Sequence, residues 1–129
     1  MLSRQRHRRL RRSLATERRR IGAATGAALK AQERALHARP GADLPVAPVQ
    51  KAERELRALA RELGGRADGD GRVQAAARGV GELADGYAAL AAAERVSDPQ
   101  KAADLTTRAV AALRAAEQQR RTAGDAWPL

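Results

Sequence analysis

Apolar side chains recur at alternating spacings of three and four residues along four stretches of this 129-residue chain. Such spacing places apolar residues on one face of an α-helix. The pattern predicts helices at about residues 3–39, 48–63, 72–95 and 99–122. Strand-favouring residues are too scattered to indicate a sheet. We therefore expect an all-α fold, a three- to four-helix bundle built from coiled-coil-like hairpins.

Turn-forming residues separate the predicted helices. Three prolines fall within residues 40–48, and glycines and aspartates dominate residues 64–71. Ser97-Asp98-Pro99 is typical of a helix N-terminus, with Asp98 or Ser97 as cap and Pro99 at the first helical position. We divide the chain into a basic segment (residues 1–20), a helical bundle (residues 21–122) and a C-terminal tail (residues 123–129).

The core must be built from small side chains, because Phe is absent and Trp and Tyr occur once each. The residues expected to pack or to form interaction surfaces are Ile21, Leu29, Leu36, Val73, Val80, Leu83, Tyr87, Leu90 and Trp127. Three glycines of the third helix (Gly79, Gly81, Gly86) weaken it by about 1 kcal/mol each and let a neighbour approach closely. Trp127 either docks into a partner or folds back over the open end of the core, and aromatic burial favours the second interpretation.

The net positive charge comes entirely from the first third of the chain. Residues 1–40 contain twelve Arg or Lys and two acidic residues, so their net charge of +10 equals that of the whole protein. Nine of the cations are the arginines of the basic segment: Arg4, Arg6, Arg8, Arg9, Arg11, Arg12, Arg18, Arg19 and Arg20. The planar guanidinium fork suits phosphate, and such charge asymmetry indicates a polyanionic partner.

Helix lengths predict that the basic segment projects from the bundle. The third and fourth helices should each be about 36 Å long, whereas a helix from 3 to 39 would reach about 55 Å. Arginine occupies every face before Ile21, and the Ala-lined seam suited to packing begins there. We therefore expect a projecting arm, and deletion of residues 2–20 should leave the bundle folded.

The sequence offers no support for catalysis, a cofactor or a metal site. Cysteine is absent, and Ser3, Ser13 and Ser97 have no visible base nearby. The two histidines lie about thirty residues apart, and Glu33 with His37 at i, i+4 indicates a surface ion pair. The stretch from Asp68 to Gly71 resembles the opening of a calcium loop, but Arg72 and Gly79 stand where ligands are required. It is interpreted as a turn.

These observations favour a small, non-enzymatic, cytoplasmic protein that binds DNA or RNA electrostatically through the basic segment. The bundle would serve as an oligomerisation or docking platform for a second copy or a helical partner. The alternative is an adaptor whose basic segment binds an acidic protein surface. No stretch reaches the roughly 20 apolar residues of a membrane span. The segment lacks the Trp or Phe that would enter an anionic membrane interface, and an organelle transit peptide is the less favoured interpretation of its composition.

Overall fold

The computed structural model describes residues 2–38 and 46–129, and the side chains of these residues except 2, 3, 28 and 31–38. Its elements are α1 (Leu2–Ser13), α2 (Ala15–Ala38), α3 (Val46–Arg66), α4 (Gly71–Arg95), α5 (Pro99–Ala123) and the short 3-10 helix η1 (Gly124–Ala126). The all-α prediction is confirmed for the described residues, none of which lies in a strand. Within the same residues, no helix is long and apolar enough to cross a membrane.

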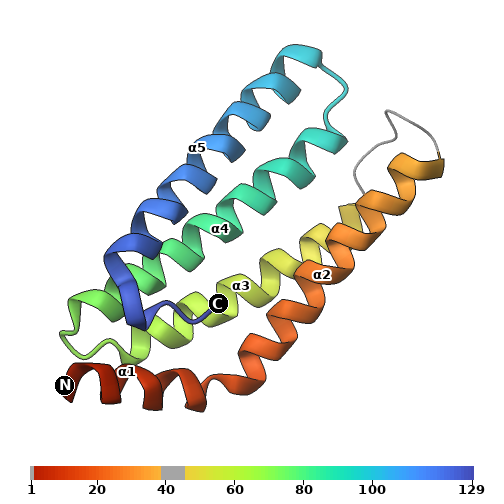
Figure 1. Ribbon diagram of the computed structural model, residues 1–129. Helices are drawn as coiled ribbons and strands as arrows, with labels where there is room; N and C mark the ends of the chain where they lie inside the picture. Colours follow the sequence, from red (N-terminus) through yellow and green to blue (C-terminus); the bar gives the residue numbers. More distant parts are fainter. Residues whose placement is uncertain (1, 39–45) are drawn as a thin grey trace.

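Helices α2 to α5 form a row in which each helix packs against the next along the chain (Figure 1). The strongest packing joins α4 to α5 and α3 to α4, and α2 packs against α3. Helix α1 crosses one end of this row and contacts η1. The result is an open layer of antiparallel helices, so α2 and α5 each keep one flank without a neighbouring helix.

The core lies between α3 and α4, toward the end of the row that α1 crosses. Leu56, Leu59 and Leu63 of α3 face Val73 and Val80 of α4, and all five are buried. Trp127 is partly buried against this cluster, as the fold-back interpretation predicts. Leu83 and Tyr87 are also partly buried against it, and Leu90 is half-buried on α4.

Leu29 and Leu36 of the first predicted helix were both expected to pack. Leu29 does not pack: it is 57% exposed, because α2 contacts α3 on one flank and no helix of the described residues covers the other. The side chains of Leu36, Glu33 and His37 lie outside the described residues, as does most of the predicted loop at 40–48.

The predicted continuous helix from 3 to 39 is wrong, because the chain turns at Leu14 between α1 and α2. The Ser13 hydroxyl donates to the Leu10 carbonyl at 2.7 Å, a local bond that competes with regular helix geometry and often bends it. Arg66 of α3 donates in turn to the Ser13 hydroxyl. Leu14, the residue at which the chain changes direction, is fully buried.

The expectation that the basic segment projects freely is also wrong for α1. His7 is 1% exposed, and Leu10 packs against the core cluster that contains Leu14. These three residues are spaced by three and four, so they share the inner face of a helical segment. That face covers the end of the layer, while the arginines occupy the remaining faces.

Two glycines of α4 provide a matched test of close helix packing. A Cβ at position 79 would lie 2.6 Å from Trp127 Cζ3 and 2.9 Å from Gln119 Cβ, whereas one at position 81 would meet nothing within 4 Å. Gly81→Ala should therefore raise the free energy of unfolding by about 0.5–1 kcal/mol through helix propensity. Gly79→Ala should lower it by about 1 kcal/mol or more, because overpacking outweighs the same gain.

Urea unfolding of the two variants measures this difference. Displacement of Trp127 by the new methyl group should also change the tryptophan emission of Gly79→Ala and leave that of Gly81→Ala unaltered. Equal stabilisation of both variants would contradict the close approach of α5 and the tail to α4.

Candidate nucleic-acid interface

The position of α1 is fixed by a buried polar contact with the turn between α3 and α4. His7 Nε2 donates to Asp70 Oδ2 at 2.9 Å, and the other ring nitrogen, Nδ1, is buried with no partner among the described residues. Arg6 reaches the same turn, where its Nη2 donates to the Ala67 carbonyl at 3.2 Å and its Nε lies 3.7 Å from Asp70 Oδ2. An imidazole and a guanidinium thus tie α1 to one carboxylate.

Asp70 also begins α4. Its Oδ1 accepts hydrogen bonds from the backbone N–H groups of Arg72 at 3.0 Å and Val73 at 3.3 Å, which is the geometry of an N-cap. Burial raises the pKa of the Asp70 carboxyl, but the hydrogen bonds from His7 and from these backbone groups together lower it below its ordinary value. The chain reverses direction between α3 and α4, and Asp68 and Gly69 in this turn have positive φ. The carboxylate therefore joins α1 to α4.

Three arginines of α1 take no part in these anchors. Arg8, Arg9 and Arg12 are exposed, and none of them has an ion-pair partner among the described side chains. Like charges three and four residues apart on one helix repel each other in the absence of a counterion. A polyanion would relieve that repulsion, so this exposed face of α1 is the candidate interface.

A small polar cleft lies along one edge of the interface. Arg4, Arg8 and Arg11 line it together with Asp125 of η1, and its volume is about 290 Å³. Arg4 Nε lies 3.3 Å from Asp125 Oδ2, although both side chains are more than half exposed. The Arg11 Nε is buried with no partner among the described groups. A carboxylate among three guanidiniums occupies the kind of position that a phosphate oxygen would take.

The other arginines of the basic segment are not gathered at this interface. Arg18 and Arg19 on α2 line an apolar groove, and Arg19 Nε donates to the Ala15 carbonyl at 3.4 Å. Arg20 is exposed beside a different groove, between α2 and α3. The nine predicted arginines thus fall into three groups, and the group on α1 includes the exposed Arg4, Arg8, Arg9 and Arg12.

Sequence reasoning missed His7 and Asp70. Asp70 was assigned to a plain turn and His7 to a charged, exposed environment. A signal was present, because His7, Leu10, Leu14 and Ile21 follow one another at spacings of three, four and seven residues. That spacing extends the α2 seam back through the basic segment.

Comparison of the chain with protein-family models, curated proteins and solved structures finds no significant match. Among the described residues, no group of three or more His, Cys, Asp or Glu side chains is placed to hold a metal ion. The assignment of a function must therefore come from the charge and geometry of the site.

Proposed function

We propose that this chain is a cytoplasmic, non-enzymatic accessory protein that binds nucleic acid electrostatically through the exposed face of α1. The observation that carries the proposal is the concentration of exposed guanidinium groups on one anchored helix. Arg8, Arg9 and Arg12 are available to phosphates, while His7, Leu10 and Leu14 hold the helix from the opposite side. Phosphate contacts of this kind act through counterion release and carry little sequence information.

Because the basic segment packs against the core, its deletion cannot test the proposal. Deletion of residues 2–20 would remove Leu10 and Leu14 from the core as well as the arginines, so loss of binding could follow from unfolding. Substitution of exposed arginines avoids this problem, because surface changes away from packing contacts usually alter stability by less than about 0.5 kcal/mol.

The decisive experiment is a salt titration of binding to duplex DNA and to structured RNA. If about five arginines engage at once, the slope of log affinity against log salt on duplex DNA should be about −4 to −5. The triple substitution of Arg8, Arg9 and Arg12 by Gln should weaken binding to all sequences alike and make the slope shallower by up to about 3.

A matched variant controls for total charge. Arg61, Arg95 and Arg114 are exposed on α3, α4 and α5, and their replacement by Gln removes the same three charges from other surfaces. This control should bind nearly as the wild type does. Equal losses in the two triple variants would refute an interface on α1, and affinity that does not depend on salt would favour the acidic-protein alternative.

Arginine-to-lysine substitution at positions 8, 9 and 12 separates the two nucleic acids. Duplex DNA should bind the lysine variant with little loss, because charge is retained. A folded RNA gripped by guanidinium forks should bind it less well.

The platform role that we propose for the helices uses the open groove between α4 and α5. Its walls are mainly alanine, its volume is about 620 Å³, and Glu82 and Arg108 both line it. A second copy related by a two-fold axis could place its Arg108 against Glu82, as isologous interfaces require. Sedimentation equilibrium should show self-association that Arg108→Glu weakens and that Glu82→Arg combined with Arg108→Glu restores. A monomer at all concentrations would remove this part of the proposal.

A further inference from the structure

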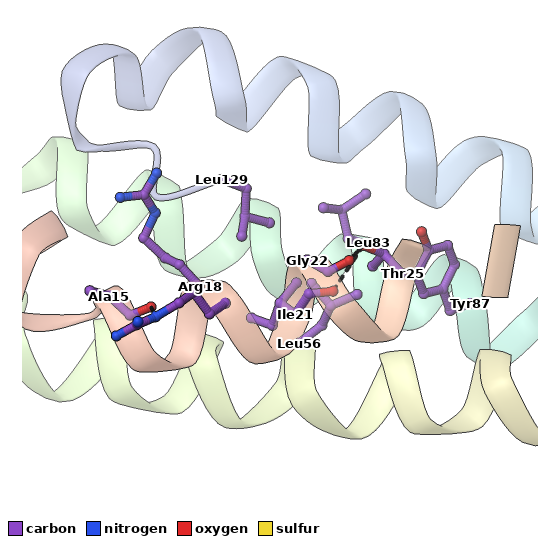
Figure 2. A pocket seen from close by; sticks show the side chains of 10 residues that line it. Ala15, Arg18, Ile21, Gly22, Thr25, Leu56, Leu83, Tyr87 and Leu129 are labelled. Carbon is purple, nitrogen blue, oxygen red and sulfur yellow. Dashed lines mark hydrogen bonds between the residues drawn. The ribbon is translucent and has the colours of Figure 1, made fainter. Parts of the chain in front are cut away.

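A second groove, separate from the arginine face of α1, runs between α2 and α4 over α3 (Figure 2). Its volume is about 500 Å³, within the range of sites that bind small molecules. Ile21, Leu56 and Leu83 form its walls and floor, and Leu129 of the C-terminal tail borders it. The nucleic-acid proposal makes no use of this groove, because it rests on phosphate contacts with the arginines of α1, none of which lines the groove.

The groove has different chemistry at its two ends. Arg18 and Ala15 lie at one end and Tyr87 at the other, with the aliphatic side chains between them (Figure 2). No Asp or Glu side chain lines it. The Thr25 hydroxyl donates to the Ile21 carbonyl at 2.8 Å, so it is occupied within its own helix. The polar groups that can hold a ligand are therefore the Arg18 guanidinium and the terminal nitrogens of Arg19, whose Nε donates to the Ala15 carbonyl, and the phenol of Tyr87.

The shape indicates an extended ligand. The α2 residues that line the groove run from Ala15 to Thr25, which corresponds to about 15 Å along a helix axis. A long apolar chain would cover the exposed parts of Leu83, Tyr87 and Leu129, and a negative head group would meet Arg18 and Arg19. Guanidinium groups bind carboxylates strongly because two parallel N–H donors match two oxygens.

We propose that this groove binds a long-chain fatty carboxylate, with the head group on Arg18 and Arg19 and the chain directed along Ile21 and Leu83 toward Tyr87. The site is independent of nucleic-acid binding by α1. It gives a function to the two arginines that the basic interface leaves aside, and to the partly exposed side chains of Leu83, Tyr87 and Leu129.

Glycine positions on α2 supply a blocking variant and its control. Gly22 lines the groove and Gly26 does not, and an added Cβ at either position meets nothing within 4 Å. Both substitutions by Leu should leave the helix intact and favour it, since Gly is the poorer helix former by about 1 kcal/mol. The side chain of Gly22→Leu would fill the groove, whereas that of Gly26→Leu would not.

The test is a titration of the full chain with a fluorescent fatty acid, followed by displacement with palmitate. We expect saturable binding of one ligand per chain, lost in Gly22→Leu and kept in Gly26→Leu. Arg18→Gln combined with Arg19→Gln should weaken binding at least about tenfold. The same two-charge change at Arg8 and Arg12 should have no effect on it.

Two further probes distinguish a free fatty acid from other lipids as the ligand. Hexadecanol, which lacks the anionic head, should bind at least about tenfold more weakly than palmitate. Anionic phospholipid vesicles should bind Gly22→Leu as they bind the wild type, through the charge of α1. Equal affinity for hexadecanol and palmitate would overturn the proposal, as would equal binding of palmitate to Gly22→Leu and Gly26→Leu. It is also overturned if free palmitate does not bind and vesicle binding is lost in Gly22→Leu.

Discussion

Replacement of Asp70 by Ala should lower the free energy of unfolding by about 3 kcal/mol. The substitution removes the N-cap of α4, which is worth about 1 kcal/mol. It also leaves His7, which is 1% exposed, without its partner, and loss of a buried hydrogen bond to a charged group costs about 1.5–3 kcal/mol. Urea unfolding monitored by circular dichroism measures the total.

Asp98→Ala is the matched control for that experiment. Asp98 caps α5 through the backbone N–H of Gln100 at 2.9 Å, and it has no partner on another helix among the described side chains. Its removal should cost about 1 kcal/mol. If both variants lose the same stability, the contact between His7 and Asp70 contributes nothing measurable.

The same carboxylate makes part of the stability depend on pH. Because the pKa of Asp70 is lowered in the folded chain, its contribution is complete above the unfolded value of 3.8 and is lost as the pH falls through the folded value. The stability difference between wild type and Asp70→Asn should therefore shrink as the pH is lowered from about 6 to about 3.

Leu14→Ala should be almost as damaging, with a loss of about 2–4 kcal/mol. Leu14 is fully buried at the turn between α1 and α2, and truncation leaves a cavity that the surrounding helices fill incompletely. Leu29→Ala, at a position that is 57% exposed on the same stretch of chain, should change stability by less than about 0.5 kcal/mol. A projecting basic arm predicts a small effect at Leu14, no larger than that at Leu29, so this pair of variants tests whether the basic segment is docked.

The sequence predicted α3 and α4 well for a physical reason. Leu56, Leu59 and Leu63 have large side chains at helical spacing, and their burial on one face follows from that spacing alone. The basic segment was harder to predict, because Leu10 and Leu14 are the only large apolar side chains between Arg4 and Arg20. A sequence so rich in charge resembles a solvated one. The partner of His7 is 63 residues away along the chain. Local spacing gives no information about such a partner.

The spacing of apolar residues in the sequence did not predict the grooves either. Arg18 and Arg19 are ordinary members of a basic run in the sequence, and only the placement of α2 beside α3 and α4 sets them at the end of an apolar channel. Sequence reasoning found the chemistry of the candidate interface, which is its charge. It did not find the division of that charge between two surfaces.

The contact of α1 with η1 has a consequence for the order of assembly. Helices α2 to α5 each pack against a neighbour in sequence, so those pairs close short loops, whereas α1 meets η1 across nearly the whole chain. The entropy lost on loop closure grows with loop length, and local contacts form sooner than distant ones. The cleft of Arg4, Arg8, Arg11 and Asp125 is therefore complete only after η1 has been synthesised and folded into place. A nascent chain that does not yet include η1 presents the arginines but not the cleft.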